Sequence, residues 1–166
     1  MRNAPLTAVF VVLAACSSPA ATTDAPSPSA PSDAFLDTFV VDPKDWSSTG
    51  HNPYFILEPG YVTEFEGEEH GKPVRLVITV LDETLVVDGV ETRVVEERET
   101  EGGELAEVSR NYFAVSKKDR GVYYFGEDVD EYEDGVVAKH GGSWRSGVNG
   151  ARFGLMMPAT PSVGMR

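Results

Sequence analysis

The sequence predicts a mostly β protein, an antiparallel β-meander that forms a curved sheet or a half-barrel. Three observations indicate this fold. β-branched and aromatic residues gather in short runs, as they do in half-buried strands. Glycine-containing pairs that favour tight turns separate these runs. No stretch after residue 50 keeps the 3.6-residue apolar period of an amphipathic helix.

Each expected strand is bounded by a turn signal. The pairs Asp88–Gly89 and Asp134–Gly135 lie between apolar runs and predict two-residue hairpins, and Gly102–Gly103 predicts a further turn. Residues 35–46 are expected to form a short helix or strand before Pro43. The runs expected as strands are 61–67, 74–83, 84–87, 90–99, 104–115, 122–126 and 136–144.

The charge of the chain excludes some partners. The 166 residues carry 27 acidic against 14 basic side chains, a formal net charge of −13. Such a surface repels phosphate groups, so nucleic acids and anionic lipid headgroups are not expected as partners. It favours bound cations or a basic protein partner. The length allows one folded domain, or two at most.

The N-terminus is typical of a bacterial lipoprotein signal peptide. Arg2 gives a positive start, and an apolar run follows from Leu6 to Ala15. This run is shorter than the ~20 residues that span a bilayer. Residues 13–16, Leu-Ala-Ala-Cys, resemble the lipobox at which lipoproteins are lipidated and cleaved. Residues 1–15 are therefore predicted to be a signal peptide, and Cys16 the lipidated first residue of the mature protein.

The lipobox resemblance implies a lipid anchor on the extracytoplasmic side of the cell membrane, or on the outer membrane facing the periplasm where the cell has two membranes. Two or three acyl chains such as palmitate on Cys16, at ~0.8 kcal/mol per buried CH₂, anchor a protein stably. Residues 16–34 are rich in Ser, Pro and Ala and predict a disordered linker. Two alternatives stay open: an ordinary secretory signal with a chance cysteine, and a buried thiol in a cytosolic protein.

Residues 35–166 make up the predicted β-rich domain, with its core over 52–164. Residues 52–67, NPYFILEPGYVTEFEG, are similar to the opening of a family of uncharacterised bacterial exported proteins and lipoproteins with the pattern N-P-Y-F-x-L-x-P-G. The blocks TVLDETLVVDGVETRVVEER, VYYFGEDVDEYEDG, GSW and GLMMPATPSVG continue the resemblance. It implies an extracytoplasmic β-rich domain with no assigned activity, and further strands after the last block.

The C-terminal stretch differs from the rest of the chain. Residues 152–166 are broken by Gly and Pro and predict no closing strand. Two interpretations follow. These residues form a mobile loop pressed against the acidic sheet, or, as the family resemblance implies, the domain is incomplete at its C-terminus.

Aromatic residues are the candidate ligand contacts. The candidates near one end of the predicted meander, and those later in the chain, are Tyr54, Phe55, Tyr61, Phe65, Tyr112, Tyr124 and Trp144. Aromatic side chains in a small β domain either fill its core or line a cavity for an apolar ligand or lipid. The sequence is compatible with either role.

Acidic residues crowd the stretch 125–135, FGEDVDEYEDG. Ca²⁺ takes six to eight oxygen ligands, and Asp128, Asp130 and Asp134 are the candidate ligands. The spacing does not match an EF-hand loop, because Tyr132 stands in its middle position. Alternate side chains of a strand also point to opposite faces, so a solvated hairpin is the competing interpretation. No other cofactor is predicted.

No catalytic constellation is visible in the sequence. His51, His70 and His140 each lie beside Gly or Asn, and Ser143 with His140 matches no triad order. Three hypotheses follow. The first is a binding or envelope-structural module that holds an apolar ligand or lipid. The second is an acidic module that docks a basic envelope protein without a ligand. The third, since acids are plentiful, is a carboxylate-based hydrolase.

Overall fold

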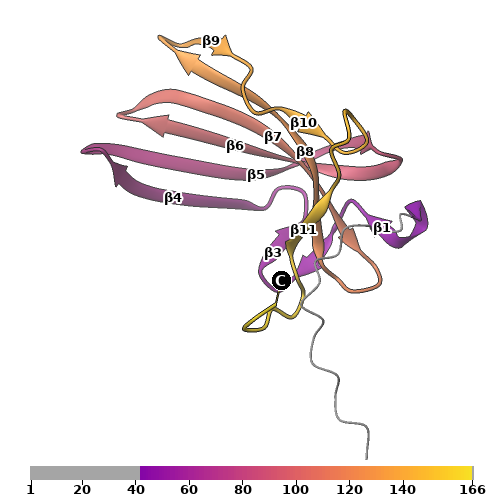
Figure 1. Cartoon of the computed structure of the whole chain (residues 1–166). Coiled ribbons are helices and arrows are strands. Elements are labelled where there is room, and N and C mark those ends of the chain that lie inside the picture. The colour runs from indigo at the N-terminus through magenta and orange to yellow at the C-terminus, as the bar shows by residue number, and fades with distance from the viewer. Residues whose placement is uncertain (1–41, 166) are drawn as a thin grey trace, which may run out of the picture. The chain divides into compact units, whose positions relative to one another are not determined.

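A computed structural model describes residues 42–165 (Figure 1). Cys16, the signal peptide 1–15 and the linker 16–34 lie outside the described residues, so the predictions made for them stay predictions. A short 3-10 turn, η1 (Pro43–Asp45), precedes the strands. These are β1 (Trp46–Ser47), β2 (Gly50–Asn52), β3 (Phe55–Leu57), β4 (Val62–Glu69), β5 (Lys72–Val87), β6 (Val90–Glu101), β7 (Glu104–Ser116), β8 (Val122–Glu133), β9 (Val136–Lys139), β10 (Trp144–Arg145) and β11 (Gly154–Met157).

The strands confirm the predicted antiparallel meander. One nine-stranded sheet has the main order β10-β8-β7-β6-β5-β4, so β4 to β8 are neighbours in the sheet and in the sequence. All pairings are antiparallel, and β2 pairs with β3 in a separate hairpin. The sheet is curved and stays open (Figure 1). Among residues 42–165, no helix has the length and apolarity needed to cross a bilayer.

Tight turns connect the long strands. Asp88–Gly89 and Asp134–Gly135 form the predicted two-residue turns, and His70–Gly71 forms a third between β4 and β5. In each pair φ is 51–52° at the first residue and 75–79° at the second. Positive φ at both residues matches the right-handed twist of a hairpin, and Gly, Asp and Asn tolerate it best. Local chemistry therefore sets the register of these hairpins.

The two edges of the sheet are finished differently. Three short strands, β9, β10 and β11, pair one after another with the outer edge of β8. β10 approaches so closely that a Cβ atom at Gly126 would collide with the carbonyl oxygen of Trp144. At the other edge, no strand within residues 42–165 pairs with the outer side of β4. One edge is thus covered, and the other is bare in the described part of the chain.

The C-terminal stretch contains a strand that the sequence pattern does not predict. Gly154–Met157 forms β11 and pairs with Val122, Tyr123 and Tyr124 of β8. A short strand interrupted by a register shift leaves no alternating pattern long enough to recognise. Its position depends on the edge of β8, which lies some thirty residues earlier in the sequence.

Each face of the sheet has its own apolar cluster. The first face, which we call the groove face, holds Leu57, Val80, Val95, Phe113, Val115 and Val122, with Phe55 and Ile78 packed against them. The second, the reverse face, holds Val87, Val90, Val94, Tyr112, Ala114, Tyr123, Phe125 and Phe153. Along the strands these apolar residues give way to charged ones, so the far half of the sheet carries glutamates, aspartates and arginines.

Candidate ligand groove and the acidic strip beside it

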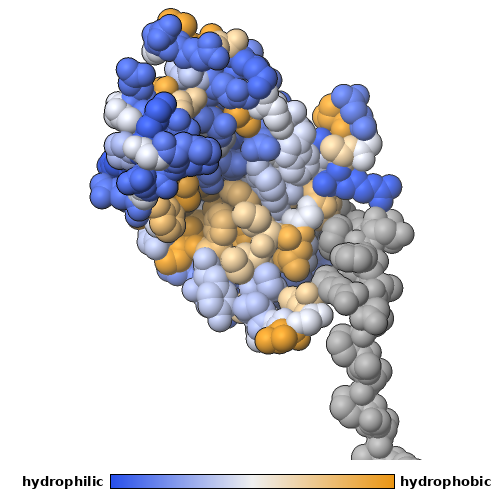
Figure 2. All heavy atoms as spheres, turned by 60° about the vertical axis from the view of Figure 1, so that its left-hand side comes forward, coloured by the Kyte–Doolittle hydropathy of each residue, from blue (hydrophilic) through white to orange (hydrophobic). Residues whose placement is uncertain are grey.

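A groove of about 320 Å³ lies on the groove face, between the β2–β3 hairpin and strands β4 and β5. Its lining is mostly apolar and consists of Pro53, Tyr54, Phe55, Ile56, Tyr61, Thr63, Phe65, Ile78, Val80 and Val95. Figure 2 shows apolar surface gathered in one area next to a strongly hydrophilic part of the molecule. The volume falls at the lower end of the ~300–1,000 Å³ typical of ligand pockets.

Asn52 holds the β2–β3 hairpin over the sheet. Its side chain is 1% exposed, and its Nδ2 donates to the carbonyl oxygens of Arg120 at 3.0 Å and Met157 at 3.3 Å. Its Oδ1 accepts from the backbone N–H of Tyr54 at 2.9 Å. Phe55 then packs on Phe113, with ring centroids 4.9 Å apart. One buried amide therefore fixes a wall of the groove.

Three aromatic rings at the mouth of the groove remain open to solvent. Tyr54 is 62% exposed, Tyr61 42% and Phe65 54%. Exposed apolar side chains scattered singly are ordinary, but contiguous ones around a hollow mark interaction sites. Beneath them, Val80 and Val95 are buried and form the floor. The rings are positioned to cover a ligand that enters the groove.

The seven aromatic candidates from the sequence separate into three groups. Tyr54, Phe55, Tyr61 and Phe65 line the groove together. Tyr124 lies on the same face, stacked on Phe113 at 4.8 Å, and Trp144 packs edge-on against Tyr124 at 5.2 Å; neither lines the groove.

Tyr112 lies on the reverse face, where its hydroxyl donates to Asp128 at 2.7 Å. The sequence analysis did not identify the residues beneath the rings of the groove, which are Ile78, Val80 and Val95. The alternation of β5, read with the His70–Gly71 turn, places Ile78 opposite Thr63 and could have found it.

A second feature of the groove face is an acidic strip, which we define as Glu97, Glu99, Glu107, Glu127 and Glu131. Glu99 pairs directly with Glu107 across β6 and β7, and Glu107 pairs with Glu131 across β7 and β8. Like charges directly opposite each other destabilise a sheet. Glu131 of this strip forms an ion pair with Lys139, with Nζ and Oε1 2.8 Å apart. On the β5 side the strip adjoins the apolar residues Leu76 and Ile78.

The reverse face balances its acids with arginines. Arg110 bonds to Glu83 at 2.5 Å, and Arg98 lies 3.8 Å from Glu96. Arg75 pairs with Glu64 on the neighbouring strand. On the reverse face, glutamates therefore lie next to arginines, whereas on the groove face of the same strands glutamates lie next to glutamates.

Burial and mutual repulsion raise the pKa values of two glutamates in the strip. Burial is the larger cause at Glu97, followed by the charges of Glu107, Glu127 and Glu99. The pKa of Glu107 is raised by burial and then by Glu99, Glu131 and Glu127. Glu97 and Glu107 therefore hold their protons more tightly than free glutamates do.

This shift predicts a pH dependence of stability. A carboxyl whose pKa is higher in the folded than in the unfolded state destabilises the fold above the folded pKa, and the cost disappears below the ordinary value of 4.5. We expect Glu97→Gln to raise the free energy of unfolding at pH 7.5 by about 0.2–1 kcal/mol and to have no such effect at about pH 3, well below the ordinary pKa. Urea titration at both pH values measures this. Glu133→Gln, an exposed acid at the end of β8, is the control, and an equal gain there would contradict the prediction.

The three calcium candidates are not brought together by the fold. Asp128 pairs with Arg145, and Asp130 contacts His140 Nδ1 at 2.6 Å. Asp134 lies in the β8–β9 turn. Among the described residues, the carboxylates that do cluster are those of Glu69, Glu99 and Glu101, whose oxygens lie within 4.8 Å of one another. Two of these three are exposed.

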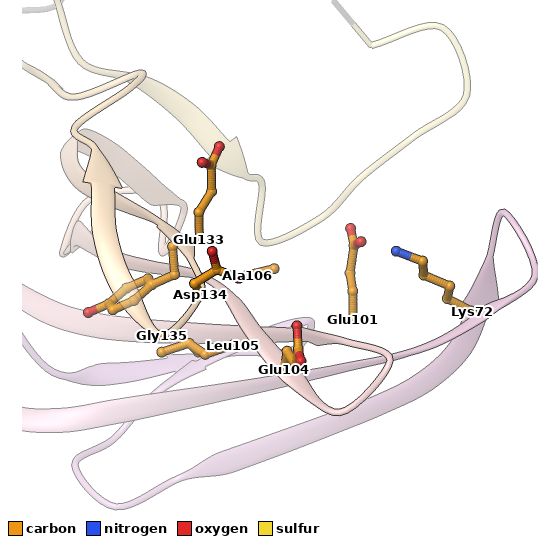
Figure 3. Close-up of a pocket in the computed structure, with 9 residues that line it drawn as sticks. Lys72, Glu101, Glu104, Leu105, Ala106, Glu133, Asp134 and Gly135 are labelled. Carbon is orange, nitrogen blue, oxygen red and sulfur yellow. The ribbon is translucent and has the colours of Figure 1, made fainter.

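A second hollow, of about 570 Å³, lies at the hairpin tips and differs from the groove in chemistry (Figure 3). It is lined by Lys72, Glu101, Glu104, Leu105, Ala106, Tyr132, Glu133, Asp134 and Gly135. Figure 3 shows the Lys72 ammonium group pointing toward Glu101. Charged side chains dominate this lining, so the hollow suits no apolar ligand.

Ser143 and His140 have separate partners. The Ser143 hydroxyl accepts from the backbone N–H of Val129 at 2.9 Å, and His140 contacts Asp130. His51 lies 3.5 Å from Glu58.

Comparisons of the chain with protein-family models, with curated proteins and with solved structures found no match.

Proposed function

We propose that this chain is an exported, lipid-anchored binding module of the bacterial cell envelope, and that its groove takes an apolar ligand or an apolar group of a partner. The observation that carries the proposal is the groove itself. It has an apolar floor on the sheet, and its mouth is formed by the exposed rings of Tyr54, Tyr61 and Phe65. These side chains gain most from a bound apolar group, because fully burying one such ring is worth about 1.5–3 kcal/mol.

The N-terminal sequence supports the location in this proposal. Cys16 provides the anchor, and the linker 16–34 provides reach from the membrane, at ~3.1 Å per residue where prolines keep it extended. The module then works on the extracytoplasmic side of the membrane, facing the periplasm where there is an outer membrane. The net charge of −13 supports the orientation, because the domain is repelled by anionic headgroups rather than pressed against them.

A second candidate function is the docking of a basic protein. The acidic strip favours it, because Glu99, Glu107 and Glu131 are held side by side, with Lys139 paired to Glu131. A basic partner would relieve that repulsion. The strip and the groove adjoin on one face, so the two candidate functions concern neighbouring surfaces.

Binding of the neutral dye Nile red tests the proposed function. We expect saturable binding to the full chain, and the double variant Tyr61→Thr, Phe65→Thr should weaken it at least tenfold, since tenfold corresponds to about 1.4 kcal/mol of lost burial. Threonine keeps the β propensity of the strand.

The matched control is Val86→Thr with Val136→Thr. Both valines are exposed apolar residues on strands, but they lie outside the groove. This pair should change dye affinity less than twofold. Equal losses in the two double variants, or binding that never saturates, would show that the dye adsorbs to apolar surface in general and would remove the support for the groove.

A further inference from the structure

We infer that the occupant of the groove is an extended polypeptide segment that adds to the sheet beside β4, antiparallel to it, and that alternates apolar with basic side chains. This inference rests on the proposed function, because it specifies the ligand of the same groove. It follows from the bare edge of β4, from the side chains on each side of that edge, and from their charge.

The edge of β4 has unpaired backbone groups in the described part of the chain. β4 pairs with β5 from Val62 to Glu69, and no other described strand pairs with it. Glu69 and Lys72 flank the two-residue turn, so they form a hydrogen-bonded pair. From there, hydrogen-bonded and non-hydrogen-bonded pairs alternate along β4 and β5, so the odd-numbered residues of β4 bond to β5. The Val80 N–H donates to the Tyr61 carbonyl at 2.9 Å, which fits the same alternation. The N–H and C=O groups of the even-numbered residues of β4 therefore point outward.

The groove face of this edge calls for apolar side chains in the added strand. Thr63, Phe65 and Gly67 of β4 lie on that face, opposite Ile78, Leu76 and Val74 of β5. A third hollow, of about 360 Å³, shares Phe65 with the groove and continues along the edge past Gly67. Space next to Gly67 is open, since a Cβ atom there would meet nothing within 4 Å. Apolar side chains at every second position would fill this line.

The reverse face of the same edge calls for basic side chains. Glu64, Glu66 and Glu68 project there, at the residues whose backbone groups point outward. Glu64 pairs with Arg75, and Glu66 and Glu68 are exposed. In antiparallel pairing, a residue directly opposite shares the face of its partner, and opposite charges in such pairs are stabilising. Lysine or arginine at the alternate positions would meet these carboxylates.

Charge disfavours β4 of a second copy of this chain as the occupant. Two β4 strands paired with each other would place glutamates opposite glutamates, which is destabilising. Charged side chains on an edge strand commonly protect a sheet from aggregation, and this protection explains why β4 carries glutamates. It does not account for the ring of Phe65 on the same strand, which is 54% exposed. An edge that repels itself and still presents apolar groups fits a basic, apolar strand from another chain.

The test uses the full chain with Cys16→Ser, so that no detergent competes for the groove, and a fluorescent seven-residue peptide that alternates lysine with valine and is blocked at both ends. Fluorescence anisotropy measures binding. N-methylation of the lysine nitrogens, which would donate to β4, should weaken binding at least tenfold. N-methylation of the valine nitrogens, which would point away from β4, should change it less than twofold.

Two variants test the charge. The double variant Glu66→Lys, Glu68→Lys should weaken binding of the peptide at least tenfold and change the affinity for Nile red less than twofold. Glu133→Lys, an acid outside β4 and the groove, should change peptide binding less than twofold. Equal binding of the two methylated peptides, or of the β4 and Glu133 variants, would overturn the inference. If Nile red binds at the groove and the peptide does not, the inference fails and the proposed function stands. If neither binds, both fail.

Discussion

Truncating Phe125 to alanine should lower the free energy of unfolding by about 3–5 kcal/mol, the range expected for a buried phenylalanine. Phe125 is fully buried, at 0% exposure, on the reverse face. Its ring stacks on Phe153 with centroids 4.5 Å apart and meets Trp46 edge-on at 5.3 Å. The cavity would open where β1, β8 and the segment before β11 meet, so these elements would lose their common contact. Chemical denaturation measures the loss.

The matched control for this prediction is the same substitution at the groove. Phe65→Ala removes an identical side chain that is 54% exposed, so it should cost no more than about 0.5 kcal/mol, as surface substitutions do. The two phenylalanines therefore separate stability from binding, because Phe65 is expected to matter for the ligand and Phe125 for the fold. Similar losses at both positions would mean that the groove is part of the core, which would contradict its assignment as a binding site.

Local sequence signals predicted the meander well because hairpins depend on neighbouring residues. Asp88–Gly89 and Asp134–Gly135 adopt the positive φ values that a two-residue turn requires, and the strands on either side follow. The strand register of β4 likewise places Thr63 and Phe65 on one face and Glu64 and Glu66 on the other, as their spacing in the sequence requires. These features need no knowledge of distant parts of the chain.

The groove could be predicted only in part, because face and distance depend on tertiary structure. Tyr112 and Phe113 are adjacent in the sequence and lie on opposite faces, and a register shift between them changes the pairing with β8. The four aromatics of the groove come together because Asn52 ties the β2–β3 hairpin to the β7–β8 loop at Arg120 and to the end of β11 at Met157, both more than sixty residues away. No local sequence pattern indicates these two hydrogen bonds.

Successive side chains of β8 point to opposite faces of the sheet, and this divides its acidic run into two groups. Asp128 and Asp130 point to the reverse face, where Arg145 and His140 meet them. Glu127 and Glu131 point to the groove face and join glutamates from β6 and β7. The sequence showed the number of acids and not their partners. The chain thus concentrates unbalanced negative charge on the face that also carries its exposed aromatic rings.

Replacing Cys16 with serine should abolish membrane association. The sulfur of Cys16 is the atom that would carry the thioether-linked lipid, and a serine hydroxyl does not accept it. With two or three acyl chains, each CH₂ contributing ~0.8 kcal/mol, the anchored form should remain with membranes through washes at high salt. The net charge of −13 gives the domain no electrostatic attraction that would retain it after the chains are lost. The variant should therefore move from the detergent phase to the aqueous phase in Triton X-114 partitioning.

Ser17→Ala is the matched control, since it changes one hydroxyl next to the anchor and leaves the thiol in place; it should partition with the wild type. Incorporation of labelled palmitate into the wild type and not into Cys16→Ser would identify the modification directly. Membrane retention of the Cys16→Ser variant would mean that another part of the chain binds the bilayer. Release of the wild type into the aqueous phase would favour the ordinary secretory signal. In that case the groove and the edge of β4 would act on freely diffusing partners rather than on those within reach of a tether.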